Sequence, residues 1–301
     1  MAEGIEAIRA GLAPQYSVES EIGAGGMAHV YLATERHPPR KVAIKVMKSG
    51  RSTPAFRERF LREIELTSRL QHPHIVPILS ADDCLFVPGG PEGLCYFVMP
   101  YIEGESLRQR LRRERRLSLA DALSITREVA DALAYAHGRS IIHRDLKPEN
   151  ILLADGHAFL ADFGIARAVS AARGHATLTS PGELVGSLAY MSPEQLAGDR
   201  LLDPRTDVYG LACVVYEMLV GATPLMEVTG RPEQQRSSLL SALQAQGVGR
   251  AVALSLRGVV ARALAADPDA RPSSVEEFQR GLQGALTPPW STRLVSLFNR
   301  A

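Results

Sequence analysis

The sequence predicts an α+β protein, in which a small antiparallel sheet with one helix precedes a larger, mainly helical part. The first hundred residues hold five segments of strand character and one helix, and after Glu103-Gly104 the pattern turns helical. Strands and helices that are segregated along the chain in this way are typical of the α+β class. The chain has 301 residues, of which 46% are hydrophobic and 22% charged, which suits one large globular domain or two small lobes.

The strands are predicted from hydrophobic alternation and from the turns that separate them. Residues 41–47 alternate, with Val42, Ile44 and Val46 expected on one face of a strand. The connector 88–91 reads Pro-Gly-Gly-Pro and is interpreted as a loop. The other strands are expected at residues 18–22, 29–33, 76–80 and 94–99.

Helices are predicted where apolar residues recur at helical spacing. A helix over residues 54–70 follows from three residues that recur every four positions, namely Phe56, Phe60 and Ile64. Ser273 and Glu276 have the spacing of a capping box, which predicts the start of the last helix. Further helices are expected within residues 1–14 and over residues 119–137, 204–220, 255–266 and 274–286, and a hairpin is expected over residues 151–160.

Composition argues against several functional classes. Lys plus Arg is 34 and Asp plus Glu is 33, so the net charge of +1 gives no reason to expect nucleic acid or an acidic membrane as a partner. The basic run at residues 108–116 is interpreted as a solvated helix face. Cys84, Cys95 and Cys213 lack metal-ligand spacing, so reduced thiols are expected. The N-terminus does not resemble a signal peptide, and the nearly apolar residues 208–220 predict a buried helix, since they are too few to span a membrane.

Residues 141–150 read Ile-Ile-His-Arg-Asp-Leu-Lys-Pro-Glu-Asn and place an acid, a base and an amide in one short loop. The carboxylate of Asp145 can accept a proton from a hydroxyl nucleophile. Lys147 can steady a phosphoryl oxygen, and the amide oxygen of Asn150 can ligate a hard cation. The loop connects a predicted helix to an apolar strand that starts at Ile151.

A glycine-rich turn, Gly23-Ala24-Gly25-Gly26, joins the first two predicted strands. Glycines let backbone N–H groups approach phosphates closely, but most turns of this kind are plain hairpins, so both interpretations stay open. The turn is not a Walker loop, because no Gly-Lys-Ser follows and no helix begins there.

Two charged residues elsewhere also have a structural and a functional interpretation. Lys45 lies in an apolar strand, where a cation is either an edge charge or a buried group that needs a partner. Glu63 on the next helix is the natural partner, and such a pair would aim the ammonium at nucleotide phosphates. Asp162, followed by Phe-Gly, is either a turn residue or, with Asn150, a hard oxygen ligand for Mg²⁺.

These pieces follow one another in a set order, and the ordered set resembles the protein kinases over residues 16–286. Residues 143–150 match the family's catalytic loop, His-Arg-Asp-x-x-x-x-Asn. A Ser-Pro-Glu ending at Glu194 stands where the family has Ala-Pro-Glu, and Arg271 matches the arginine that pairs with that glutamate. The stretches Gly-Ala-Gly-Gly-Met-Ala-His-Val-Tyr and Tyr-Met-Ser-Pro-Glu-Gln are similar to those of bacterial eukaryotic-like (Hanks-type) serine/threonine protein kinases.

The resemblance implies a bilobal protein kinase fold. It divides the chain into an N-terminal extension at residues 1–15, a kinase domain at residues 16–286 and a C-terminal tail at residues 287–301. Within the domain, a small sheet-rich lobe is expected at residues 16–102 and a larger helical lobe at residues 103–286.

The resemblance also implies ATP and Mg²⁺, or Mn²⁺, as cosubstrate and cofactor. The residues expected to take part in catalysis are Asp145, Lys147, Lys45 and Glu63, and those expected to hold the metal are Asn150 and Asp162. The expected ATP-binding residues are Ile22, Gly23, Gly25, Gly26, Val30, Ala43, Lys45, Met99, Pro100 and Ile102. Pro100 lacks an N–H group, but the resemblance asks only for its carbonyl, with the N–H of Ile102, to bind adenine. Lys147 marks the Ser/Thr class of substrates.

The activation segment, residues 162–194, is expected to carry the regulation. Arg144 is predicted to be a buried cation that awaits an anion, and a phosphothreonine in this segment would supply one and order the loop. The candidates are Thr177, Thr179 and Ser180. The resemblance to the bacterial kinases implies Thr179 as the first choice, because it lies eight residues before Ser187 as in those relatives, and Thr177 is the next choice. The alternative is a polar loop without modification.

Two alternatives to an active kinase would leave different marks in the sequence. A pseudokinase that binds nucleotide or partners without catalysis would carry damage at Lys45, Asp145, Asn150 or Asp162, and all four are intact. A small-molecule phosphotransferase would lack the long activation segment. Protein substrates and a cytoplasmic location are expected, either alone or as the cytoplasmic domain of a longer membrane-anchored kinase. A homodimer through the small lobe stays open.

Overall fold

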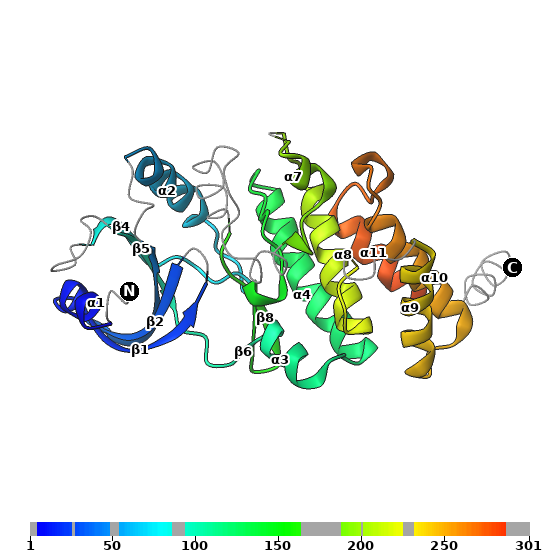
Figure 1. Cartoon of the computed structure of the whole chain (residues 1–301), viewed down its shortest axis with the longest axis horizontal. Coiled ribbons are helices and arrows are strands. Elements are labelled where there is room, and N and C mark those ends of the chain that lie inside the picture. Colours follow the sequence, from blue (N-terminus) through cyan, green and yellow to red (C-terminus); the bar gives the residue numbers. More distant parts are fainter. Residues whose placement is uncertain are drawn as a thin grey trace, which may run out of the picture. The chain divides into compact units, whose positions relative to one another are not determined.

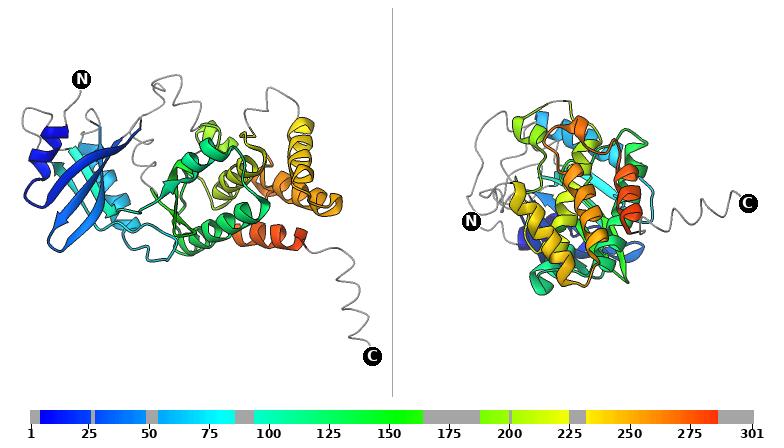
Figure 2. Two further views of the ribbon diagram at one scale, coloured as in Figure 1. Left: turned by 90° about the horizontal axis from the view of Figure 1, so that it is seen from below. Right: turned by 90° about the vertical axis from the view of Figure 1, so that its right-hand side faces the viewer.

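The computed structural model describes residues 5–25, 28–48, 54–85, 94–163, 188–199, 201–224 and 232–286. The chain divides into two compact units, shown in Figure 1 and from two further sides in Figure 2. The first unit comprises Met1–Gly104 and Leu160–Val185, and the second comprises Glu105–Phe159 and Gly186–Ala301. The first contains a five-stranded sheet and the second is mainly helical, so the predicted α+β class is confirmed.

The sheet of the first unit is antiparallel and has the strand order β1-β2-β3-β5-β4. One face is covered by helix α1 (Ile5–Leu12), whose Ile8 and Leu12 are buried against Tyr31, Ile44 and Val98 of the sheet (Figure 1). This apolar contact stabilises the sheet by removing the apolar side chains of this cluster from water. The strands are β1 (Tyr16–Ala24), β2 (Ala28–Arg36), β3 (Pro39–Met47), β4 (Ser80–Leu85) and β5 (Leu94–Pro100).

Helix α2 (Pro54–Thr67) buries the apolar face that its sequence predicts, with Phe56, Phe60 and Ile64 all inaccessible or nearly so. The ring of Phe60 lies 6.4 Å from the ring of Phe97 on β5, measured between centroids. Aromatic pairs at this distance add to the stabilisation that burial alone provides. Helix α2 is therefore attached to the sheet through Phe97.

The strand predicted at residues 76–80 is wrong, because β4 begins only at Ser80. The apolar run before it forms its hydrogen bonds elsewhere. The Val76 N–H donates to the Leu160 carbonyl over 3.0 Å, and the Leu160 N–H donates to the His74 carbonyl over 2.8 Å. Apolar runs on their own do not reveal which segment they pair with, so the sequence placed this strand too early.

The second unit is built around helix α8 (Arg205–Val220), which is buried along nearly its whole length, as predicted for residues 204–220. It contacts four other helices, namely α4 (Leu119–His137), α9 (Pro232–Ala245), α10 (Arg250–Ala263) and α11 (Val275–Leu286). The second unit also contains helices α3 (Leu107–Glu114) and α7 (Pro193–Ala197) and nearly all of a small sheet. That sheet is formed by β6 (Glu105–Ser106), β7 (Ile151–Ala154) and β8 (His157–Leu160). Among the described residues, no helix is both long and apolar enough to cross a membrane.

The capping box predicted from Ser273 and Glu276 is wrong by one residue. Ser274 Oγ accepts from the Glu277 N–H over 3.2 Å, and α11 starts at Val275. The Glu277 carboxylate accepts from the backbone N–H and the hydroxyl of Ser273, both over 2.7 Å. Two serines followed by two glutamates allow either register in the sequence, and the hydrogen bonds select the later one.

The solvated helix face predicted for residues 108–116 is wrong at its first residue. Arg108 on α3 has a side chain that is only 17% exposed, and it forms an ion pair with the buried Glu217 of α8. Arg113 on the same helix is 60% exposed and fits the prediction. The charges alone cannot distinguish these two arginines, because the difference lies in which side of α3 faces the unit's interior.

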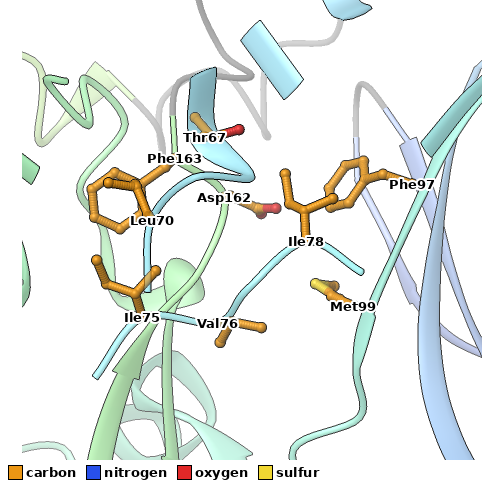
Figure 3. A pocket seen from close by; sticks show the side chains of 9 residues that line it. All are labelled: Thr67, Leu70, Ile75, Val76, Ile78, Phe97, Met99, Asp162 and Phe163. Atoms are coloured by element: carbon orange, nitrogen blue, oxygen red, sulfur yellow. The ribbon is translucent and has the colours of Figure 1, made fainter. Parts of the chain in front are cut away.

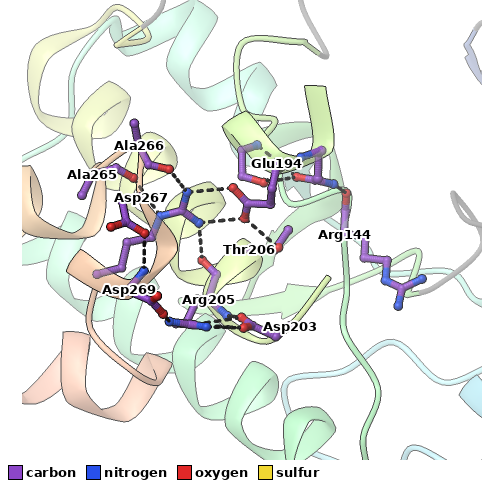
Figure 4. A network of polar contacts seen from close by, with 12 residues as sticks. Arg144, Glu194, Asp203, Arg205, Thr206, Ala265, Ala266, Asp267 and Asp269 are labelled. Carbon is purple, nitrogen blue, oxygen red and sulfur yellow. Dashed lines mark hydrogen bonds and ion pairs between the residues drawn. The ribbon is translucent and has the colours of Figure 1, made fainter. Parts of the chain in front are cut away.

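A buried ion pair joins α7 to the loop before α11, as the sequence predicts for Glu194 and Arg271. The Arg271 side chain is fully buried, and its Nη1 and Nη2 lie 2.8 Å from Glu194 Oε1 and Oε2 (Figure 4). The remaining N–H groups donate to the carbonyls of Ala265, Ala266 and Arg205. Because all five donors of the guanidinium have acceptors, the charge is buried without an unsatisfied group.

The same contacts shift the ionisation of Glu194. Burial alone would raise the pKa of this carboxyl group, but hydrogen bonds from Arg271, the backbone, Ser192 and Thr206 outweigh it and lower the pKa to about 2. A carboxyl group with a lowered pKa stabilises the folded state above its ordinary value of 4.5, and this contribution is lost as the pH falls toward about 2.

We expect Arg271→Met to lower the free energy of unfolding by about 3–5 kcal/mol, because it leaves the Glu194 carboxylate buried without its partner. Urea denaturation followed by circular dichroism measures this. The matched control is Arg113→Ala, which removes an exposed ion pair with Glu105 and should leave the urea midpoint almost unchanged. Equal losses in the two variants would contradict the prediction.

We expect the stability difference between the wild type and Glu194→Gln to shrink as the pH falls from about 6 to about 3, because over that range the unfolded wild type takes up a proton at Glu194 that the folded wild type does not. Urea midpoints at a series of pH values measure the difference. A difference that is constant across the series would show that the Glu194 carboxyl group does not titrate with a lowered pKa.

Candidate active site

The candidate residues form two groups, one within each unit. In the first unit the sheet register places Gly23, Val30, Lys45 and Phe97 side by side on β1, β2, β3 and β5. Residues that are paired across neighbouring strands point to the same face, so these side chains share one face of the sheet. It is the face opposite α1. Ala43 and Met99 are paired two residues further along the same strands.

The remaining residues predicted to bind ATP lie around this row. Ile22 is exposed on β1, and Gly25 follows the strand, where its N–H donates to the Ala28 carbonyl over 3.0 Å. Pro100 ends β5 opposite Val42, and Ile102 lies half-buried just after it. Gly26 lies outside the described residues. The register of the sheet therefore brings the central members of the predicted set together.

Lys45 is a partly buried cation with an anionic partner, which excludes the interpretation as a simple edge charge. Its Nζ lies 2.6 Å from Oδ2 of Asp162, and both side chains are less than a fifth exposed. The ammonium also lies 6.0 Å from the centre of the Phe97 ring. The contact between Lys45 and Asp162 joins residues that are 117 positions apart in the sequence. The predicted pairing of Lys45 with Glu63 stays a prediction.

Asp162 has a backbone φ of +66°, in the left-handed region that residues other than glycine rarely adopt. Such a conformation costs free energy and persists only where the surroundings hold it, which is common at functional sites. Here the contact with Lys45 is one such restraint, and the neighbouring Phe163 is another, since its ring is buried. The backbone thus turns the Asp162 carboxylate toward the sheet.

A small cavity lies beside this contact (Figure 3). In Figure 3, Phe97 and Met99 of β5 lie on one side of it, and Leu70, Ile75 and Phe163 on the other. The lining is apolar except for Thr67 and Asp162; the other residues are Leu70, Ile75, Val76, Ile78, Phe97, Met99 and Phe163. An apolar surround strengthens the attraction between Lys45 and Asp162, because little water screens it.

The second group lies in the second unit, at the loop that the sequence singles out. Lys147 Nζ lies 2.7 Å from Oδ2 of Asp145, and the amide nitrogen of Asn150 lies 3.1 Å from the same oxygen. The Asn150 amide nitrogen also donates to the Asp145 carbonyl over 2.8 Å. The three predicted side chains are therefore in contact, and both of these side-chain bonds go to Oδ2 of Asp145.

The loop keeps this shape because α8 holds its backbone. The buried Asp207 carboxylate accepts from the N–H groups of His143 and Arg144, each over 2.8 Å, and from Nε2 of His137 over 2.8 Å. Burial would raise the pKa of Asp207, but the hydrogen bond and charge of His137, with the other contacts, outweigh it and lower that pKa. The carboxylate therefore stays ionised and fixes two successive peptide groups of the loop.

Further contacts fix the loop from its other sides. The Asp145 N–H donates to Nδ1 of His143 over 3.2 Å, and the Gln195 side chain donates to the Arg144 carbonyl over 2.7 Å. Gly210 lies one turn after Asp207 on α8, and a Cβ at this position would come within 3.2 Å of Leu146 Cβ. Helix α8 approaches the loop closely because residue 210 has no side chain.

Sequence reasoning did not assign His137, Asp207 and Gly210 to the support of this loop. The available signal was an aspartate at the start of an otherwise apolar helix, since a buried carboxylate must have partners. The expectation for Arg144 also needs correction, because its side chain is half-buried rather than buried. Thr177, Thr179 and Ser187 lie outside the described residues.

The residues proposed to hold a metal fit Mg²⁺ in their chemistry. The amide nitrogen of Asn150 is engaged by Asp145, which orients its amide oxygen as a neutral oxygen donor, and Asp162 supplies a carboxylate. Mg²⁺ prefers such oxygen ligands and needs few from the protein, because it keeps several waters. Within the described ranges, no group of three or more His, Cys, Asp or Glu side chains is arranged to hold a metal ion.

Comparison with known proteins agrees with this geometry. The family model of the protein kinase domain matches residues 16–284. The chain is 37% identical over 279 residues to serine/threonine-protein kinase PknJ of Mycobacterium tuberculosis, covering 90% of this chain and 45% of that protein. It is 34% identical to serine/threonine-protein kinase PrkC of Bacillus subtilis, covering 90% of this chain and 40% of that protein. The chain thus spans less than half the length of these curated relatives.

Two solved structures are similar as well. The crystal structure of the Mycobacterium tuberculosis PknI kinase domain superposes with a TM-score of 0.67 at 31% identity, covering 90% of this chain and 96% of that one. Rad53 residues 1–466 in complex with AMP-PNP has a TM-score of 0.68 at 24% identity, covering 92% of this chain and 66% of that one, and shows the fold alone. With its kinase fold, its intact catalytic loop and these relatives, the chain belongs to the protein kinase family, among the bacterial eukaryotic-like serine/threonine kinases.

Proposed function

We propose that this chain is an active kinase domain that transfers the γ-phosphoryl group of MgATP to Ser or Thr hydroxyls of proteins. The observation that carries the proposal is the contact of Asp145 with Lys147 and Asn150 on a loop that Asp207 holds in place. Phosphoryl transfer needs little covalent chemistry from the protein, so positioned charges account for most of the catalysis.

In the proposed step, Asp145 Oδ1 accepts the hydrogen of the substrate hydroxyl and orients its oxygen toward the γ-phosphorus. The new O–P bond forms as the bond from the γ-phosphorus to the β–γ bridging oxygen breaks, and ADP leaves with that electron pair. The proton of the hydroxyl passes to Asp145. Lys147 stabilises negative charge on the transferred group, and a bound Mg²⁺ would neutralise charge on the phosphates.

The nucleotide is proposed to bind along the first unit's sheet. Val30 and Ala43 would cover the adenine ring, and the Pro100 carbonyl and the Ile102 N–H would bind its polar edge. Lys45 would contact the α- and β-phosphates, with Asp162 and Glu63 as its anionic neighbours. The present contact between Lys45 and Asp162 supports this assignment, because it places the cation near a proposed metal ligand.

The location and partners are also proposals. We place the domain in the cytoplasm, where ATP and protein substrates are available, either alone or as the cytoplasmic part of a longer membrane-anchored kinase. The chain covers 45% and 40% of the length of the two curated relatives, which is compatible with either arrangement. A homodimer through the sheet-containing unit is a further proposal, and sedimentation of the purified chain would test it.

We expect Asp145→Asn to lower kcat for phosphorylation of a generic basic protein by about 10²–10⁴-fold, because the amide cannot accept the proton. Labelled ATP measures the transfer, and calorimetry should show nearly unchanged binding of MgADP. Asp155→Asn is the matched control, since it makes the same chemical change in an exposed turn whose left-handed backbone asparagine tolerates. A wild type that binds MgATP without transfer would favour the pseudokinase alternative.

We expect incubation with MgATP to place phosphate on Thr179 or Thr177, which mass spectrometry of the digested protein would locate. A phosphothreonine there would add an anion that Arg144 can bind and would raise activity toward other proteins. Asp145→Asn treated in parallel controls for phosphate carried over from expression. A fully active enzyme with an unmodified segment would reject this form of regulation.

A further inference from the structure

Arg108 on α3 joins four segments of the second unit. Its Nε lies 2.8 Å from Glu149 Oε1, and its Nη1 lies 2.6 Å from Glu217 Oε1 on α8. Its Nη2 donates to the hydroxyl of Tyr190, which in turn donates to Glu217 Oε2. One guanidinium therefore connects α3, the segment before α7, α8 and the end of the catalytic loop.

The cluster is more enclosed than a surface salt bridge. The side chains of Arg108 and Glu217 are 17% and 8% exposed, and Tyr190 is buried. Burial alone would lower the pKa of Arg108, but the hydrogen bonds and charges of Glu217, Tyr190 and Glu149 raise it instead. Charge-assisted hydrogen bonds of this kind fix geometry strongly where little water competes.

The cluster reaches the proposed metal ligand through its neighbours in the chain. Glu149 immediately precedes Asn150, and both belong to a short 3-10 helix, Pro148–Asn150. On the other side of Asn150, Leu152 of β7 is paired with Ser106 of β6, which is also the N-cap of α3. The first turn of α3 is therefore attached to the chain both just before and just after Asn150.

Through this arrangement Arg108 restricts the position of the Asn150 side-chain amide. Glu149 is 45% exposed, and its carboxylate would be free to rotate in water without the bond from Arg108. With that bond, residues 148–150 are fixed to α8 through Glu217. Positioning partners of metal ligands commonly change metal affinity or activity by about 10–100-fold when removed.

We propose that Arg108 is a positioning residue, which orients the Asn150 amide toward the catalytic metal by fixing Glu149 to α8. This inference rests on the proposed function, because the proposed function is what makes Asn150 a metal ligand. The inference adds a residue that affects metal binding and lies outside the kinase motifs. That residue is on α3, whose sequence predicts a solvated basic helix.

The test compares Arg108→Met, which keeps the apolar stem, with Glu149→Gln and with Arg112→Met, a control on the exposed side of the same helix. Calorimetry measures ADP affinity as Mg²⁺ is raised, and labelled ATP measures kcat and KM. For Arg108→Met we expect about a tenfold rise in the Mg²⁺ needed for half-maximal ADP affinity and a fall in kcat of the same order. ADP affinity without Mg²⁺ should be unchanged.

Glu149→Gln keeps the inference testable if Arg108→Met does not fold, because Glu149 is the exposed member of the cluster. We expect it to raise the Mg²⁺ requirement in the same direction, with an unchanged urea midpoint, and Arg112→Met to match the wild type. A stable Glu149→Gln with normal Mg²⁺ response, or an Arg108→Met that loses only stability, would overturn the inference.

The two proposals fail in different ways. A wild type that transfers no phosphate, but whose Mg²⁺-dependent ADP binding is weakened by Arg108→Met, would refute the proposed activity and support the positioning role. An active wild type whose variants keep normal metal response would refute the positioning role alone.

Discussion

The arrangement of the catalytic loop depends on one buried carboxylate. Asp207, in the first turn of α8, accepts the N–H groups of two successive loop residues and the ring nitrogen of His137. The N-terminal end of a helix carries partial positive charge, so an ionised aspartate is favoured at this place. A carboxylate without partners would be costly there, and the loop supplies those partners. The fold of α8 and the shape of the loop therefore depend on each other.

Helix α8 contacts the catalytic loop and the neighbouring Arg108 cluster at three positions along its length. Gly210 lies three residues after Asp207 and lets α8 approach Leu146, and Glu217 lies seven residues further on and binds Arg108 and Tyr190. Positions spaced by three and seven residues share one face of an α-helix. One face of α8 therefore carries three features. The Asp207 carboxylate binds the loop backbone, the missing side chain of Gly210 leaves room for Leu146, and the Glu217 carboxylate binds Arg108 and Tyr190.

Much of this could be predicted from the sequence, because the candidate catalytic residues of the loop are close together in it. Asp145, Lys147 and Asn150 lie within six positions, and the structure places them in contact as expected. Periodicity also located α2 and α8, since each buries the face that its apolar residues define.

Two of the errors have a common cause, which is that pairing partners far apart in the chain leave no local signal. The segment before β4 pairs with Leu160, and Arg108 turns inward to Glu217. The contact between Lys45 and Asp162, 117 positions apart, was not anticipated for the same reason. Hydrophobic alternation and charge spacing predict which face of a segment is apolar or charged, but they do not predict which other segment packs on that face. Helix α9 was missed for a different reason, because its first turns, Pro-Glu-Gln-Gln-Arg-Ser-Ser, show no apolar pattern of helical spacing.

The close approach at Gly210 limits how this region can diverge. A methyl group at residue 210 would press on Leu146, which lies between Asp145 and Lys147, so a shift of Leu146 would reach both of these neighbouring loop residues. An alanine at this place would require the Leu146 side chain to move by a few tenths of an ångström. In the course of evolution, a side chain at residue 210 would therefore be favoured together with a smaller one at residue 146.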